Sequence, residues 1–282
     1  MRLQQALIGA TLVLATLLGS GCERVFFGVV NRGLPPPEAT FAYAPDLALS
    51  LDLYRPQGVH ARSAPVVLFF YGGGWHRGER DQYRFVGRRL AQHGILAIVA
   101  DYRTFPQAGF PDFVDDAARA VAWTRRHADG YGGDPRRVFL AGHSAGAQIA
   151  ALLGTDPRYL QRHGARPRDL AGVIGLAGPY DFAITGKYRA VFGPTAQWPQ
   201  AQAVNFVDGD EPAFLLVHGD RDRVVEARDS VELADKLRGQ GVAARLLILP
   251  GASHGAPLAG LYAPHREPAV LPALLAFVGA TD

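Results

Sequence analysis

The pentapeptide GHSAG at residues 142–146 places Ser144 between two glycines. An apolar segment precedes it and an alanine-rich segment follows it, a pattern that predicts a strand turning tightly into a helix. Glycines at both flanks remove side chains that would collide in such a turn, and the serine hydroxyl then stands at the N-terminus of the helix. A serine in this position could attack a carbonyl carbon once a neighbouring base removes its proton.

An acid and a base follow Ser144 along the chain. Asp220 and Asp222 come after one apolar segment and His254 comes after another, so all three are expected at the carboxyl ends of strands. Most of the nine histidines lie in polar or helical contexts that are typical of surface residues, and His218 is expected to support the acidic loop. We therefore expect His254 to be the base, with Asp220 or Asp222 on its other ring nitrogen to hold its tautomer.

Three consecutive glycines at residues 72–74 follow the apolar run 66–71. Without side chains, their backbone N–H groups can approach a ligand oxygen closely. Such donors can stabilise the negative charge that forms on the former carbonyl oxygen of a tetrahedral intermediate.

The candidate walls of a substrate pocket are the side chains of Trp75, His76, Tyr180 and Phe182.

Strand-like and helix-like segments alternate from about residue 48 onward. The predicted strands span residues 50–55, 66–71, 95–101, 138–142, 173–177, 214–218 and 244–249. The predicted helices span residues 84–93, 112–127, 144–153, 226–238 and 268–278. This alternation predicts an α/β fold with a mostly parallel central sheet and helices on both faces. Proline, glycine and aromatic residues dominate 178–211, which predicts a lid-like excursion over the carboxyl edge of the sheet, where such folds bind ligands.

Several motifs of the chain resemble the α/β-hydrolase superfamily, specifically the bacterial carboxylesterases related to hormone-sensitive lipase, feruloyl esterase-like proteins and kynurenine formamidases. The matching stretches, within residues 48–279, are 71–75, 101–103, 110–123, 132–135, 143–146 and 218–225. The resemblance implies an α/β-hydrolase fold. The site residues that it implies are the nucleophile Ser144, the acid Asp222, the base His254, and the oxyanion-hole N–H groups of Gly73, Gly74 and Ala145.

One position departs from the pattern of that superfamily. Tyr71 stands where a histidine usually begins the glycine loop. The usual histidine supports the loop and does not react. We therefore expect tyrosine at this position to affect how the loop is held and how substrate fits, more than the reaction itself. The charged residues Asp101 and Arg103, beside a predicted strand, are expected to form a structural network under the same loop.

The resemblance implies a serine carboxylesterase that hydrolyses short-chain or aromatic acyl esters through a Ser-His-Asp triad and an acyl-enzyme intermediate. An arylformamidase is the alternative enzyme, because the elbow sequence HSAGAQ is similar to that of the kynurenine formamidases. A catalytically inactive binding lipoprotein is a third interpretation, which the presence of all three triad residues disfavours. The expected substrate is a small-molecule ester or formamide.

The N-terminus has the features of an export signal. Arg2 precedes the apolar stretch 3–18, which is short for a transmembrane helix, and small residues precede Cys22. This arrangement resembles a bacterial lipoprotein signal, in which the cysteine receives a diacylglycerol. The expected division of the chain is a signal peptide at 1–21, a lipid-anchored tether at 22–47 and a hydrolase domain at 48–282. We thus expect attachment to the membrane of the bacterial cell envelope. The alternatives are a plain secretory signal with an incidental cysteine and a simple N-terminal anchor.

Composition excludes several other classes of protein. The 29 basic and 26 acidic residues give a formal net charge of +3 without a block of like charge, which argues against a nucleic-acid surface. A single cysteine excludes a disulfide framework and a cysteine-based zinc cluster. No His, Asp and Glu cluster has metal-ligand spacing and no glycine-rich loop follows a dinucleotide or P-loop pattern, so we expect neither a metal nor a cofactor.

Overall fold

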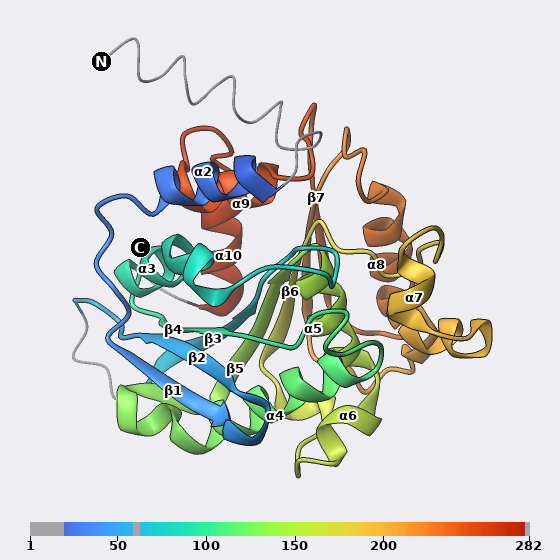
Figure 1. The fold of residues 1–282 in the computed structure, drawn as a ribbon, viewed down its shortest axis with the longest axis horizontal. Coiled ribbons are helices and arrows are strands. Elements are labelled where there is room, and N and C mark those ends of the chain that lie inside the picture. The colour runs from blue at the N-terminus through green and yellow to red at the C-terminus, as the bar shows by residue number, and fades with distance from the viewer. Residues whose placement is uncertain (1–19, 59–62, 280–282) are drawn as a thin grey trace.

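The computed structural model describes residues 20–58 and 63–279. An eight-stranded sheet lies at its centre, with the strands in the order β1-β2-β4-β3-β5-β6-β7-β8 (Figure 1). Strand β2 pairs antiparallel with both β1 and β4, and all other neighbours pair in parallel. The strands are β1 (Ala39–Ala44), β2 (Leu49–Tyr54), β3 (Ala64–Phe70), β4 (Leu96–Ala100), β5 (Gly133–His143), β6 (Gly172–Leu176), β7 (Phe214–Gly219) and β8 (Ala244–Leu249). The predicted α/β-hydrolase fold is confirmed.

Helices cover both faces of this sheet, with α3 and α10 on one face and α4 and α5 on the other (Figure 1). The α-helices are α2 (Ser20–Val30), α3 (Arg84–Gln92), α4 (Asp112–His127), α5 (Ala145–Thr155), α6 (Pro157–Gln161), α7 (Tyr188–Phe192), α8 (Ala227–Gly239), α9 (Ala256–Tyr262) and α10 (Val270–Val278). The 3-10 turns are Pro45–Leu47, Arg80–Tyr83, Ala128–Tyr131, Pro167–Asp169, Thr195–Ala201 and Ala203–Phe206. Every residue of β3 and β4 is buried, as the continuous apolar runs of these strands require.

The segment expected to be a tether, residues 22–47, is instead part of the folded domain. Strand β1 extends the sheet, and its Phe41 packs on Trp123 with ring centroids 5.2 Å apart. Helix α2 lies on the domain through Phe27, whose ring is 5.2 Å from that of Tyr83. The tether prediction was wrong because these aromatic side chains bury apolar area against rings that are distant in sequence, Trp123 of α4 and Tyr83 of the 3-10 turn before α3.

The expected signal peptide lies almost wholly outside the described residues. Cys22 falls within helix α2. In the described parts of the chain, none of the helices combines the length and the apolar character needed to cross a membrane.

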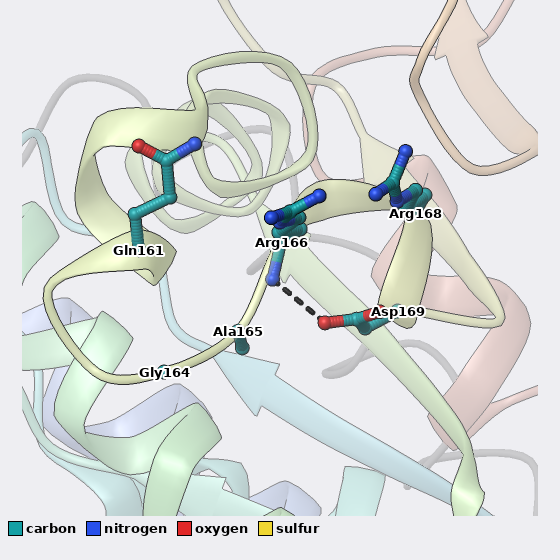
Figure 2. A pocket seen from close by; sticks show the side chains of 6 residues that line it. All are labelled: Gln161, Gly164, Ala165, Arg166, Arg168 and Asp169. Atoms are coloured by element: carbon teal, nitrogen blue, oxygen red, sulfur yellow. Dashed lines mark hydrogen bonds between the residues drawn. The ribbon is translucent and has the colours of Figure 1, made fainter.

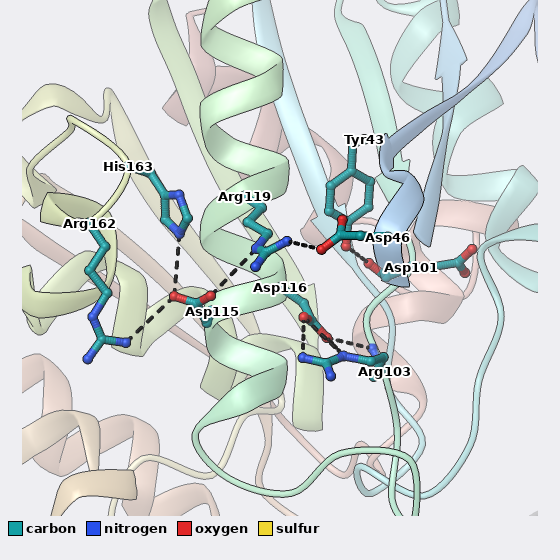
Figure 3. Close-up of polar contacts among 9 residues, drawn as sticks. All are labelled: Tyr43, Asp46, Asp101, Arg103, Asp115, Asp116, Arg119, Arg162 and His163. Carbon is teal, nitrogen blue, oxygen red and sulfur yellow. Dashed lines mark hydrogen bonds and ion pairs between the residues drawn. The ribbon is translucent and has the colours of Figure 1, made fainter. Parts of the chain in front are cut away.

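A network of charged side chains holds the end of β4 against helix α4 (Figure 3). The Arg103 guanidinium donates to both carboxylate oxygens of the fully buried Asp116, with Nη2 2.8 Å from Oδ1 and Nε 2.9 Å from Oδ2. Arg80 forms an ion pair with Asp101, and the Tyr43 hydroxyl donates to the Asp101 carbonyl at 2.6 Å. Arg103 and Asp101 thus each form an ion pair within the fold, as is typical of structural charged residues.

Candidate active site

Ser144 lies at the sharp turn between β5 and α5. Its backbone has φ 54° and ψ −119°, a region that costs energy for any residue with a side chain. The turn is held because the Ser144 N–H donates to the Leu176 carbonyl of β6 at 2.9 Å. It is also tightly packed, since a Cβ on Gly146 would collide with the carbonyls of Phe70 and Tyr71. This strained turn gives Ser144 the predicted elbow geometry.

His254 and Asp222 meet at the same edge of the sheet. Asp222 follows β7, His254 follows β8, and the His254 Nδ1 lies 2.7 Å from Asp222 Oδ2. The imidazole is also beside the elbow, because its ring centroid is 4.9 Å from that of His143 and the His143 Nε2 donates to the His254 carbonyl at 3.1 Å. Within the described residues, no hydrogen bond joins the Ser144 hydroxyl to the imidazole. Such contacts often tighten only when substrate binds.

Hydrogen bonds hold the Asp222 carboxylate in its ionised form. Its Oδ1 accepts the N–H groups of Val224 and Val225 at 2.8 and 3.0 Å, and its Oδ2 also accepts from His218 Nε2 at 3.1 Å. Burial alone would raise the pKa of Asp222, but the hydrogen bonds from His218 and His254 outweigh burial and hold that pKa well below its usual range. The carboxylate therefore stays charged and oriented at neutral pH.

The other acidic candidate, Asp220, has a different position. It is exposed, and its Oδ1 accepts the N–H of Gly251 at 2.6 Å. This contact ties the loop after β7 to the loop after β8. Asp220 is thus a loop-bracing residue, whereas Asp222 is the carboxylate that contacts an imidazole.

The glycine loop after β3 faces Ser144. Gly73 has φ 139°, and a Cβ there would collide with the Arg77 carbonyl, so the loop path requires glycine at this position. Gly74 lines the same cavity as Ser144. Ala145 is the first residue of α5, and its N–H has no acceptor within the helix. These backbone groups are suited to bind an oxyanion.

Tyr71 supports the start of this loop in place of a histidine. Its ring stacks on that of Tyr102 with centroids 4.5 Å apart. The Tyr102 hydroxyl donates to the Tyr71 carbonyl at 2.8 Å, and the Tyr71 hydroxyl donates to the Tyr102 carbonyl at 3.2 Å. Both rings are buried, which raises the pKa of each phenol well above its ordinary value. This neutral pair of tyrosines anchors the end of β3 to the end of β4.

A cavity of about 240 Å³ opens above Ser144. Its lining residues are Gly74, Trp75, Ser144, Pro179, Asp181, Phe182, Ala183, Tyr188, Val224, Val225, Glu226, Arg228 and Asp229. The predicted wall residues Trp75 and Phe182 are among them, and their rings stack with centroids 5.4 Å apart. The excursion 178–211 therefore supplies part of the cavity wall.

Two predicted wall residues do not line the cavity. Tyr180 is fully buried, with its ring packed over the glycine positions 175 and 178. His76 donates from Nδ1 to the Gly74 carbonyl at 2.8 Å, and its ring packs between Phe105 and Tyr188. Aromatic type and position in the chain gave no indication of which way these side chains would turn.

Tyr188 and Asp229 are among the cavity residues that sequence reasoning missed. Tyr188 begins the short helix α7, and no regular pattern in the excursion marked it. Asp229 lies in the first turn of α8, where an acidic residue ordinarily stabilises the helix from the surface. Here the residue is only 3% exposed and lines the cavity, which only the tertiary structure reveals.

The fully buried Gln148 of α5 joins the glycine loop to the excursion. Its Oε1 accepts from the Trp75 indole N–H at 3.2 Å, and its Nε2 donates to the Ala201 carbonyl at 2.9 Å. Trp75 follows Gly74 and has φ 58°, so its backbone needs such support. Gln148 thus fixes one wall of the cavity beside the nucleophile candidate.

A second depression lies on another part of the surface, around α6 and the turn after it (Figure 2). Its lining residues are Gln161, Gly164, Ala165, Arg166, Arg168 and Asp169. The Arg166 backbone N–H donates to Asp169 there at 2.9 Å. This second depression includes none of the predicted site residues.

Among residues 20–58 and 63–279, no three His, Cys, Asp or Glu side chains are grouped so that they could hold a metal ion.

The sequence is similar to those of proteins named as esterases. The chain is 31% identical over 234 residues to the esterase LipC of Mycobacterium tuberculosis, covering 76% of this chain and 58% of the relative. It is 30% identical over 227 residues to isoprenylcysteine alpha-carbonyl methylesterase ICME of Arabidopsis thaliana, covering 72% and 53%. The chain thus spans a little over half the length of these relatives.

Solved structures share the fold. The butyrate-bound esterase Est2 of Thermogutta terrifontis has a TM-score of 0.73 at 24% identity, covering 88% of this chain and 96% of that one. A truncated carbohydrate esterase from gut microbiota has a TM-score of 0.73 at 20% identity, covering 87% and 100%. The BD-FAE family model matches residues 51–237, which include Ser144 and Asp222. The chain, with its strained serine elbow on an α/β-hydrolase sheet, belongs to the BD-FAE family.

Proposed function

We propose that the protein is a serine carboxylesterase with Ser144, His254 and Asp222 as its triad. The observation that carries the proposal is the 2.7 Å contact between His254 Nδ1 and Asp222 Oδ2, at the loop that His143 ties to the Ser144 elbow. The esterase names of the relatives support the same reaction class. A carboxylate that remains ionised beside an imidazole is the arrangement that a serine nucleophile needs.

The reaction then proceeds in two halves. Ser144 Oγ attacks the ester carbonyl carbon while its proton passes to the Nε2 of His254, and the carbonyl oxygen becomes an oxyanion. The N–H groups of Gly73, Gly74 and Ala145 stabilise that oxyanion. The C–O bond to the alcohol breaks as His254 returns the proton to the leaving oxygen. Water attacks the resulting acyl-enzyme by the same route and releases the carboxylic acid.

The cavity supports short-chain or aromatic acyl esters as substrates. Its volume of about 240 Å³ is small, and the rings of Trp75, Phe182 and Tyr188 provide flat apolar walls. Butyrate and propionate complexes of the Thermogutta esterase are consistent with short acyl groups. A screen of nitrophenyl esters of graded chain length, with N-formylkynurenine beside them, tests this choice. Faster turnover of the formamide would replace the ester assignment by arylformamidase.

Labelling by a fluorophosphonate probe tests the proposed nucleophile. The folded wild-type protein should be labelled on Ser144 and should hydrolyse nitrophenyl butyrate. Replacement of Ser144 by alanine should abolish labelling and lower kcat/KM by at least about 10³-fold while leaving the circular dichroism spectrum unchanged. A folded wild-type protein that resists the probe and hydrolyses no ester would refute the proposal.

We also propose that Cys22 carries a lipid anchor at the bacterial cell envelope. The apolar stretch 3–18 and the small residues before Cys22 support an exported lipoprotein. Because α2 packs against the domain, the anchor would hold the enzyme close to the membrane. Expression of the full chain in a bacterial host should place it in the membrane fraction, and Cys22→Ala should release it. Unchanged fractionation of the variant would contradict acylation at this residue.

A further inference from the structure

Asp229 is a buried carboxylate in the wall of the candidate active site. It is 3% exposed and lines the same cavity as Ser144. Its Oδ2 accepts the backbone N–H groups of Tyr180 and Asp181 at 3.0 and 3.4 Å. Within the described part of the chain, its Oδ1 has no hydrogen-bond partner. One oxygen of the carboxylate is thus used by the fold, and the other is left for a ligand.

Among the described residues, no cationic side chain pairs directly with the Asp229 carboxylate. Burial raises its pKa to about 6 despite the two amide hydrogen bonds and the opposing electrostatic effects of Arg228 and His218. A buried carboxylate without a cation costs stability, because the charge loses its hydration without gaining a partner. Such a group is retained at a cost to the fold, and a cationic ligand would offset that cost.

The rest of the cavity has the same sign of charge. Asp181 and Glu226 also line it, and both are exposed. Among the described residues that line it, Arg228 is the only basic one, and its Nε lies 3.8 Å from Glu226 and 3.6 Å from Glu232. That guanidinium is therefore already close to two carboxylates, that of Glu232 in the same helix and that of Glu226 just before the helix. The cavity as a whole favours a positive group and disfavours an anionic one.

The apolar walls fit the same kind of ligand. The rings of Trp75, Phe182 and Tyr188 line the cavity, and aromatic faces attract ammonium groups. We propose that Asp229 is a specificity-determining residue that selects esters carrying a positively charged nitrogen in the acyl or alcohol part. This inference rests on the proposed esterase function and names the substrate class for the same site.

Two matched pairs of esters test the inference. In the first pair, acetylcholine is compared with its isostere in which a tert-butyl group replaces the trimethylammonium group. In the second pair, the nitrophenyl ester of trimethylammoniobutyrate is compared with its tert-butyl isostere. Each pair differs in charge and hardly in shape, so the ratio of kcat/KM within a pair reports recognition of the charge on the alcohol side or on the acyl side.

The variant Asp229→Asn removes the charge but keeps an oxygen that can accept from Tyr180 and Asp181. Wild-type protein should prefer the cationic member of at least one pair about tenfold or more, and the variant should lose that preference by about ten- to hundredfold. Asp235→Asn is the matched control, because Asp235 lies on the same helix, is exposed and pairs with Arg238. That control should keep the wild-type ratio.

The outcomes separate this inference from the proposed function. If the wild type is labelled by fluorophosphonate and hydrolyses the neutral esters but shows no cationic preference in either pair, the role of Asp229 is overturned and the esterase assignment stands. A preference that survives in Asp229→Asn overturns it as well. If no ester is hydrolysed and the probe does not react, the esterase assignment itself fails.

Discussion

His218 and His254 both contact the same oxygen of Asp222, at 3.1 and 2.7 Å from Oδ2. His218 Nε2 also lies 3.2 Å from the Val225 carbonyl, which can only accept, so Nε2 carries the hydrogen. On the other side of the ring, the Nδ1 of His218 is hydrogen-bonded to the Ser230 hydroxyl at 2.7 Å. His218 is therefore an oriented donor that helps keep Asp222 ionised for His254.

Replacement of His218 by phenylalanine should lower kcat/KM about tenfold, because one donor to a buried carboxylate is lost. The free energy of unfolding should fall by about 1–3 kcal/mol for the same reason. His218→Gln retains an N–H donor and should recover most of the activity. Steady-state kinetics and urea unfolding measure both effects, and a glutamine variant no better than phenylalanine would show that the donor is not what matters.

The strained backbone of Ser144 predicts a difference between two inactive variants. Glycine adopts φ 54° without the steric cost that alanine bears. Ser144→Gly should therefore be more stable than Ser144→Ala by about 1 kcal/mol, although both lack the nucleophile. Urea unfolding of the two variants provides the measurement. Equal stabilities would mean that the elbow carries no strain at this position.

The link from Trp75 through Gln148 to Ala201 predicts coupled mutations. Gln148→Leu leaves a buried indole N–H and a buried carbonyl without partners, so we expect a loss of about 1–3 kcal/mol in the free energy of unfolding. Because Trp75 adjoins Gly74, kcat should also fall. A double-mutant cycle with Trp75→Phe should give a coupling energy of about 1 kcal/mol, and strictly additive effects would rule out the link.

The pKa of Asp229 predicts how stability depends on pH. The pKa of Asp229 in the folded protein, about 6, exceeds the ordinary value of 3.8, so the protonated carboxyl favours the folded state. This stabilisation is fully present below pH 3.8 and is lost as the pH rises through about 6. Asp229→Asn should therefore be more stable than the wild type at pH 8, by about 1–3 kcal/mol, and should lose this advantage near pH 4. Urea unfolding at both pH values tests the sign. A variant that is less stable at pH 8 would show that the carboxylate is a structural group.

Local patterns in the sequence determined most of the sheet and its helices. Alternating apolar strands and amphipathic helices were placed to within a few residues, because periodicity depends only on neighbours along the chain. Local sequence patterns did not predict the elements near the N-terminus. There, β1 and α2 are stabilised by contacts with Trp123 and Tyr83, which are far away in sequence.

For the site, residue types and chain order were enough to nominate a serine, an acid and a histidine, since the chemistry demands those groups. The residues alone left Asp220 and Asp222 open, and only the folded loops bring Asp222 to the imidazole while Asp220 turns to Gly251. The burial of Tyr180 and the entry of Asp229 into the cavity were likewise decided by packing. Side-chain direction in loops and first helical turns depends on the surfaces that meet there, and no local pattern encodes those surfaces.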